Sequence, residues 1–189
     1  QMDVHNVSLV TEEMYANAMV TAGVEDARVM VTAPVEVTGT TALTGIMMAF
    51  EEASGKELTK DAKKIASEEL LLTGEMGEKL GKDDAAELIK NVKEQIVRQK
   101  IKDPDDIRKI ILDIAHQLGL ELSEDQILQI LQLMKKISTL DLNVDKISEQ
   151  LGRLQTNLGI IKDTLEKNKG LIQRILDTIL GWLRTIFGK

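Results

Sequence analysis

The sequence predicts an α+β fold that is predominantly helical. A small N-terminal strand-helix-strand-helix unit comes first, and a helical bundle with a long C-terminal amphipathic helix follows. Three observations support this order: β-branched runs occur near the N-terminus, helix start and stop signals recur after residue 59, and apolar side chains follow a regular spacing over the last quarter. We expect the units to span residues 1–57, 58–141 and 142–189.

The N-terminal unit begins with an aliphatic run that is typical of a strand: Val4, Val7, Leu9 and Val10. A helix is predicted from Thr11 to about Ala22, because two acidic residues follow Thr11 and Gly23 is a natural stop. The β-branched run from Ala27 to Val37 predicts a second strand, in which Pro34 lies at an edge or ends the pairing.

A second helix is predicted from about Ala42 to Ser54, with Gly55 after it. It lies in the longest uncharged stretch, Val37 to Phe50, which is typical of a buried helix. Two strands rarely form a sheet that is stable alone. We therefore expect a preceding segment, or a second copy of the chain, to supply further strands.

Helices without strands are predicted for the middle of the chain. Thr59 is expected to cap a helix that ends near Leu72. Three glycines then predict a loop: Gly74, Gly77 and Gly81. Asp83 is expected to cap the next helix, which runs to about Lys100.

Two further helices carry strong start signals. Asp103 is an N-cap carboxylate and Pro104 stands at the first helical position, which predicts a helix to about residue 118. Ser123 and Gln126 have the spacing of a capping box, which predicts a helix to about residue 138.

A seam of side chains spaced alternately three and four apart runs through the last quarter: Val144, Ile147, Leu151, Leu154, Leu158, Ile161, Leu165, Asn168, Ile172, Ile175, Ile179, Trp182 and Ile186. That spacing keeps one line of side chains on one face of a helix. Because burial of each aliphatic side chain contributes about 1.5–3 kcal/mol, we expect the seam to be covered by this chain, another copy, another protein or a lipid surface.

The predicted interaction residues come from this seam and its broad C-terminal face: Leu158, Ile161, Leu165, Ile172, Ile175, Ile179, Trp182, Leu183, Ile186 and Phe187. The flanking positions are mostly neutral, which favours a bundle helix, within one chain or shared between copies, over a charge-selected zipper. From residue 171 onward the apolar face is wide and its rim is basic, so that a membrane surface is an alternative partner.

Composition excludes several classes of function. The 189 residues include no cysteine, which excludes disulfide frameworks and thiol or zinc-cysteine chemistry. A net charge of −7 and the scarcity of aromatic residues argue against a nucleic-acid partner. No apolar run reaches the roughly 18 residues that a membrane-spanning helix needs.

No motif predicts a catalytic, cofactor or metal site. The turn at residues 38–41 precedes a helix N-terminus, which can attract an anion, but the spacing and the lysine of a P-loop are absent. The glycines at residues 74–81 fail the same pattern. His5 and His116 have no nucleophile placed near them by the sequence. Three acidic residues lack the EF-hand pattern of a calcium site: Asp103, Asp105 and Asp106.

Two N-terminal runs resemble hallmark motifs of the YpuA-like family of secreted proteins of Gram-positive bacteria. They are residues 11–24 (TEEMYANAMVTAGV) and residues 33–46 (APVEVTGTTALTGI), and residues 122–127 are similar to the C-terminal half of the family. The family is a domain of unknown function. The resemblance implies export, a signal peptide and a further N-terminal segment, and it implies no catalytic residue.

These observations predict a non-enzymatic, extracytoplasmic interaction module of the cell envelope. We expect it to bind itself or an envelope protein through its C-terminal helices, without a cofactor. Two alternatives stay open: a membrane-surface module anchored by residues 171–189, and an envelope hydrolase that uses Asp or Glu.

Overall fold

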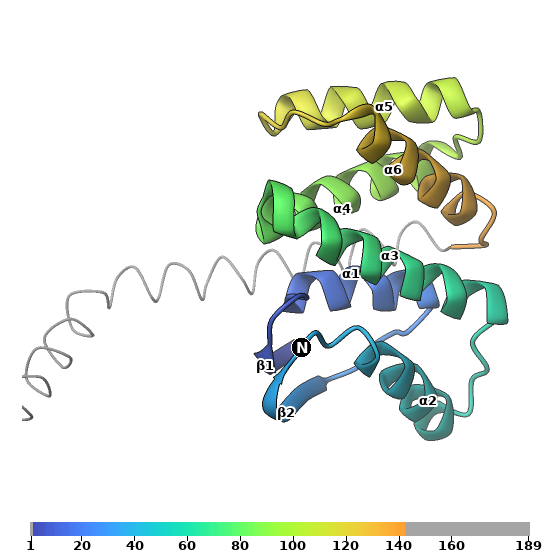
Figure 1. The fold of residues 1–189 in the computed structure, drawn as a ribbon. Coiled ribbons are helices and arrows are strands. Elements are labelled where there is room, and N and C mark those ends of the chain that lie inside the picture. The colour runs from blue at the N-terminus through green and yellow to red at the C-terminus, as the bar shows by residue number, and fades with distance from the viewer. Residues whose placement is uncertain (1, 143–189) are drawn as a thin grey trace, which may run out of the picture. The chain divides into compact units, whose positions relative to one another are not determined.

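The computed structural model of the chain describes residues 2–142, which belong to a compact unit at residues Gln1–Leu151. Within the described residues two strands and six helices follow one another in the order β1-α1-β2-α2-α3-α4-α5-α6 (Figure 1). The strands are β1 (Met2–Val7) and β2 (Val29–Val37). The helices are α1 (Glu12–Ala22), α2 (Ala42–Ser54), α3 (Lys60–Leu80), α4 (Lys82–Gln99), α5 (Pro104–Gln117) and α6 (Glu124–Ile137).

The predominantly helical α+β fold is confirmed for these residues. The strand-helix-strand-helix order is also as predicted, and helices alone follow it as far as residue 142. The long C-terminal amphipathic helix lies outside the described residues.

The two strands pair in parallel, and α1 forms the crossover between them. The register begins with Met2 opposite Val29 and breaks after His5. Pro34 lies beyond that break, in an irregular stretch of β2. Proline has no N–H, and the parallel pairing with β1 requires no hydrogen bond from an N–H at this position.

Helix α1 is enclosed by the rest of the fold. Every residue from Met14 to Ala22 is buried, and Figure 1 shows the helix between the strands and α3. A helix that carries small and apolar residues all around its axis has no face suited to water, so it occupies the interior. The predicted caps are confirmed: the Thr11 hydroxyl accepts from the N–H of Met14, and Gly23 ends the helix in the left-handed conformation.

The turn before α2 is joined to the core through Gly39. This residue has a φ of 86°, and its carbonyl accepts a hydrogen bond from the Tyr15 hydroxyl. A Cβ at this position would lie 2.4 Å from Val7 Cγ1 and 2.6 Å from Tyr15 Oη, so only glycine fits. Thr41 is the N-cap residue of α2, but its side chain makes no capping hydrogen bond.

The loop predicted at Gly74 to Gly81 is wrong, because α3 continues to Leu80. A Cβ at Gly74 would lie 3.0 Å from Leu9 Cγ, and one at Gly77 would lie 3.2 Å from Lys82 Cα. These glycines let α3 approach its neighbours closely. Packing therefore outweighs the roughly 1 kcal/mol by which glycine disfavours a helix interior.

Helix α4 starts earlier than predicted. Its N-cap is Gly81, which has no side chain to make a capping bond. The capping role predicted for Asp83 is therefore wrong. Asp83 and Asp84 instead lie in the first turn, where their charges complement the helix dipole.

The start signals of α5 and α6 are confirmed. Asp103 Oδ1 accepts from the N–H of Asp105 at 2.9 Å, and Pro104 is the first residue of α5. Ser123 and Gln126 form the complete capping box at the start of α6.

The four helices α3 to α6 share an aliphatic core that contains, among others, Ile89, Ile96, Ile111, Ile130 and Met134. Among the described residues, no helix has both the length and the hydropathy needed to cross a membrane.

The buried phenol of Tyr15 gives the fold a measurable pH dependence. Burial raises the pKa of Tyr15 from 10.0 to about 12. Between these values the folded state retains a proton that the unfolded state has lost, so the stabilisation is complete below pH 10 and disappears as the pH rises. We expect the free energy of unfolding in urea to fall by roughly 3 kcal/mol over this interval.

The control for this prediction is Tyr15→Phe, which has no phenolic proton. Its unfolding free energy should change less over the same interval. Equal pH dependence of the two proteins would contradict the prediction.

Candidate functional site

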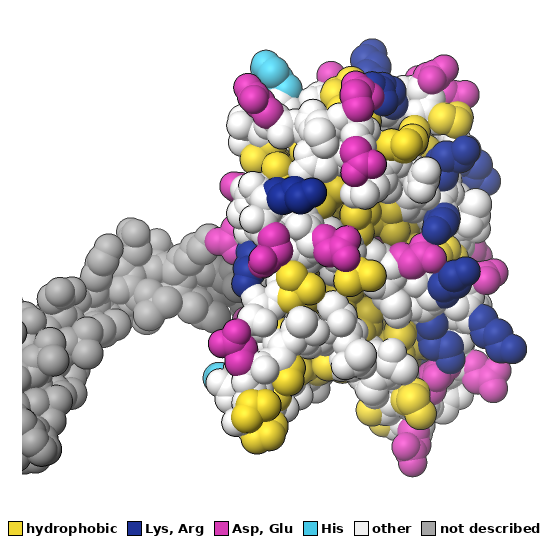
Figure 2. All heavy atoms as spheres, in the orientation of Figure 1, with side chains coloured by type: hydrophobic (Ala, Val, Ile, Leu, Met, Phe, Trp, Pro, Cys, Tyr) yellow, Lys and Arg dark blue, Asp and Glu magenta, His cyan; other side chains and the backbone are white. Residues whose placement is uncertain are grey.

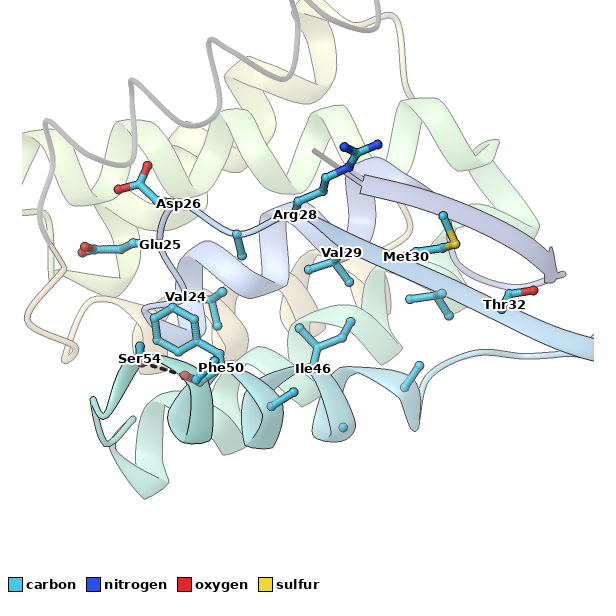
Figure 3. Close-up of a pocket in the computed structure, with 16 residues that line it drawn as sticks. Val24, Glu25, Asp26, Arg28, Val29, Met30, Thr32, Ile46, Phe50 and Ser54 are labelled. Atoms are coloured by element: carbon cyan, nitrogen blue, oxygen red, sulfur yellow. Dashed lines mark hydrogen bonds between the residues drawn. The ribbon is translucent and has the colours of Figure 1, made fainter.

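An open groove of about 800 Å³ separates β2 from α2. One wall is the segment from Val24 to Thr32, which leaves α1 and enters β2. In Figure 3, Ile46 and Phe50 rise from α2 toward β2, and Val29 points from β2 into the same space. The walls are mainly apolar, as in sites that bind apolar side chains.

Helix α2 forms its side of the groove because its apolar residues cover more than one face. Leu43 and Met47 are buried in the fold. Ile46 and Phe50 are only half-buried along the groove, and Met48 is exposed. A helix that buries part of its apolar surface leaves the remainder for another partner.

Charged groups lie at one end of the groove, where the chain passes from α1 to β2. Glu25 and Asp26 lie there, and Glu25 Oε2 pairs with Lys56 Nζ at 3.5 Å. Arg28 follows them, and Figure 3 shows its side chain pointing away from α2. The groove therefore suits an apolar occupant that meets charge only at the rim.

Further hydrophobic side chains reach the surface around the groove. Met30, Val35 and Val37 of β2 are exposed, as is Met48 of α2. Figure 2 shows hydrophobic side chains at the lower end of the molecule, over the regions of β2 and α2, with a hollow between them. Exposed apolar surface beside a groove is typical of a binding site.

A second cluster of chemically reactive groups is buried between α1, α3 and α4. Lys93 Nζ donates to Glu69 Oε1 at 2.6 Å, to the Asn17 carbonyl at 2.7 Å and to Thr21 Oγ1 at 3.0 Å. The Thr21 hydroxyl donates to Glu69 Oε2. All three ammonium protons and both carboxylate oxygens therefore have partners.

This cluster joins α1, α3 and α4 through hydrogen bonds made by the Lys93 ammonium and the Glu69 carboxylate. Burial lowers the pKa of Lys93, and the attraction and hydrogen bond of Glu69 oppose that change. A general base needs a lone pair within reach of a substrate, whereas Lys93 and Glu69 are hydrogen-bonded within the cluster. Lys90 Nζ and Glu13 Oε1, 3.3 Å apart, add an ion pair between α4 and α1.

Comparisons with known proteins decide the family. The family described as "Protein of unknown function (DUF1002)" matches residues 1–154. The chain belongs to the DUF1002 family. It is 38% identical over 177 residues to a Bacillus subtilis (strain 168) protein named "Uncharacterized protein YpuA". That alignment covers 93% of this chain, and the chain spans 61% of the length of the relative. No solved structure matches the chain.

The resemblance to the YpuA-like family is therefore confirmed. The ten interaction residues predicted for this DUF1002 chain, between Leu158 and Phe187, lie outside the described residues and stay predictions. The structure brings none of the other candidates together as a site. His5 is exposed on β1 and His116 is exposed at the end of α5. Within residues 2–142, no group of three or more His, Asp or Glu side chains is arranged to hold a metal ion.

Sequence reasoning missed the groove of this DUF1002 chain. The uncharged stretch from Val37 to Phe50 was the available signal, and it predicts a buried helix. That prediction is wrong for most of α2, in which only Leu43 and Met47 are buried. The spacing of apolar residues shows that α2 has surface to cover, but the separation of α2 from β2 is set by the rest of the fold.

Proposed function

We propose that this DUF1002 chain is a non-enzymatic interaction module of the cell envelope that binds a protein segment in the groove between β2 and α2. The groove carries this proposal. Its walls are apolar, its surroundings expose Met30, Val35 and Met48, and water is a poor partner for all of them.

The chemistry of the buried groups supports binding over catalysis. Lys93 donates three hydrogen bonds within the protein, and each carboxylate oxygen of Glu69 accepts one. The groove is lined mainly by aliphatic side chains and Phe50, which supply no nucleophile or general base. Its carboxylates, Glu25 and Asp26, lie at one end, where Glu25 pairs with Lys56, and the Ser54 hydroxyl donates to the Phe50 carbonyl.

The extracytoplasmic setting is proposed from the resemblance to secreted proteins and from the absence of cysteine in the sequence. The C-terminal seam remains a second contact surface, proposed from its spacing alone. In this proposal the protein has two apolar surfaces, one described by the structure and one in residues 143–189.

Photocrosslinking in the host cells tests the groove. Phe50 would be replaced by a photoreactive phenylalanine analogue, which keeps an aromatic ring at the half-buried position. Irradiation should produce a discrete covalent adduct, because an occupant of the groove lies against this ring. The mass of the adduct distinguishes a second copy from another protein.

The matched control carries the same analogue at Leu112, an exposed apolar position on α5. It should give no discrete adduct, or at least several-fold less of the adduct formed at position 50. Equal labelling at both positions, or none at position 50, would contradict binding in the groove.

A further inference from the structure

Strand β2 has one paired edge and one open edge. Within the described residues, the sheet contains β1 and β2 alone. Asn6 Nδ2 donates to the Ala33 carbonyl, and Ser8 N donates to the Val37 carbonyl. Ala33 and Val37, both odd-numbered residues of β2, therefore direct their backbone groups toward β1. Because backbone groups alternate in direction along a strand, those of Met30 and Thr32 point to the open edge. Such an edge is a template for another strand.

The two halves of β2 have different surroundings. The residues from Val29 to Thr32 line the groove opposite α2. The residues from Pro34 to Val37 are exposed, and Val35 is 66% exposed. One half therefore offers an apolar groove and the other half offers free apolar side chains. Two identical strands that run antiparallel bring each half against the opposite half of the other copy.

Charges at the two ends of β2 define one register for such a pair. Arg28 and Glu36 lie four positions before and after Thr32. Both are exposed, and neither belongs to an ion pair among the described residues. Pairing about Thr32 places Arg28 of each copy opposite Glu36 of the other, whereas pairing about Val31 or Ala33 leaves both charges without a counter-charge.

We infer that two copies of this chain associate through antiparallel pairing of β2 with β2, centred on Thr32, with residues 33–37 of each copy in the groove of the other. The inference rests on the proposed function and identifies the partner of the groove as a second copy. The combined sheet has four strands in the order β1-β2-β2-β1, and four is a usual number of strands for a stable sheet.

The directions of the side chains agree with this arrangement. Residues directly opposite each other in an antiparallel pair point to the same face. Val35 of the second copy lies opposite Val29, which points into the groove, so it enters the groove beside Ile46 and Phe50. Pro34 lies opposite Met30 and has no N–H, so that pair forms one hydrogen bond in place of two.

A single introduced cysteine tests the register, because the chain has none of its own. In the purified Thr32→Cys protein, the two Cα atoms of this hydrogen-bonded pair would be about 5.5 Å apart, within the range of a disulfide. We expect mild oxidation to link most of the protein into dimers. In Val35→Cys, the two cysteines would be about 20 Å apart, so the dimer yield should be at least fivefold lower.

Charge reversal tests the same register without cysteine. Arg28→Glu places like charges together at both ends of the pair, and we expect the dimer dissociation constant from analytical ultracentrifugation to rise roughly tenfold. The double variant Arg28→Glu/Glu36→Arg restores opposite charges and should recover dimerisation. Circular dichroism confirms that each variant is folded before its association is measured.

Three results would overturn the inference: a protein that stays monomeric, equal disulfide yields at positions 32 and 35, or equal dimerisation of Arg28→Glu and the double variant. A dimer held only by residues 143–189 would show the last two. If the photocrosslink at Phe50 then identifies a different protein, the groove still binds a partner and the proposed function stands without this dimer. If position 50 forms no adduct, both proposals fail.

Discussion

Glu69→Gln should lower the free energy of unfolding by about 3–5 kcal/mol. Glu69 and Lys93 are 1% and 0% exposed, and their charged atoms are 2.6 Å apart. The amide has nearly the shape of the carboxylate but carries no charge. Lys93 must then stay buried without a counter-charge or lose its proton, and both outcomes disfavour the folded state. Urea unfolding followed by circular dichroism measures the difference.

The adjacent residue supplies the control. Glu68 lies on the same helix and pairs with Lys136 at 2.7 Å, but both side chains are partly exposed to water. Glu68→Gln should therefore change the unfolding free energy by no more than about 1 kcal/mol. If the two substitutions were equally destabilising, burial of the Lys93 ion pair would not be the cause.

Gly39→Ala should destabilise the protein by about 2–5 kcal/mol. The alanine must adopt a φ of 86°, which disfavours a residue with a Cβ by about 1–2 kcal/mol. Its methyl group would also overlap Val7 Cγ1 and Tyr15 Oη, and overpacking of a core adds about 1–3 kcal/mol. Chemical denaturation of the variant measures the sum.

Gly55→Ala separates these two contributions. Gly55 ends α2 with a φ of 68°, and a Cβ there would have no neighbour within 4 Å. We expect this variant to lose only the backbone contribution, about 1–2 kcal/mol. A loss at position 39 no larger than that at position 55 would show that the contacts with Val7 and Tyr15 tolerate a methyl group.

Local signals located the elements where the chain itself supplies the partner. Thr11, Asp103 and Ser123 cap their helices as predicted, because each side chain reaches a backbone N–H two or three residues along the same chain. Such a bond depends little on the rest of the fold. Gly23 and Gly55 end helices for a similar local reason.

The same signals were wrong where distant residues decide the outcome. Gly74 and Gly77 have the composition of a loop, but they lie inside α3 because Leu9, Met14 and Lys82 approach them closely. No spacing within residues 60–80 reveals those neighbours. The buried cluster of Lys93 was equally hidden, because its partners lie 24 to 76 positions away in the sequence.

By itself the sequence determined the fold class, the order of strands and helices, the caps of α5 and α6, and the family. These follow from side-chain periodicity and from contacts within a few residues. Only the tertiary structure decided that α2 stands apart from β2 and leaves an apolar groove, and that Glu69 meets Lys93 in the interior. The reason is physical: a groove or a buried ion pair depends on distances between elements, which are set by how all their faces pack together.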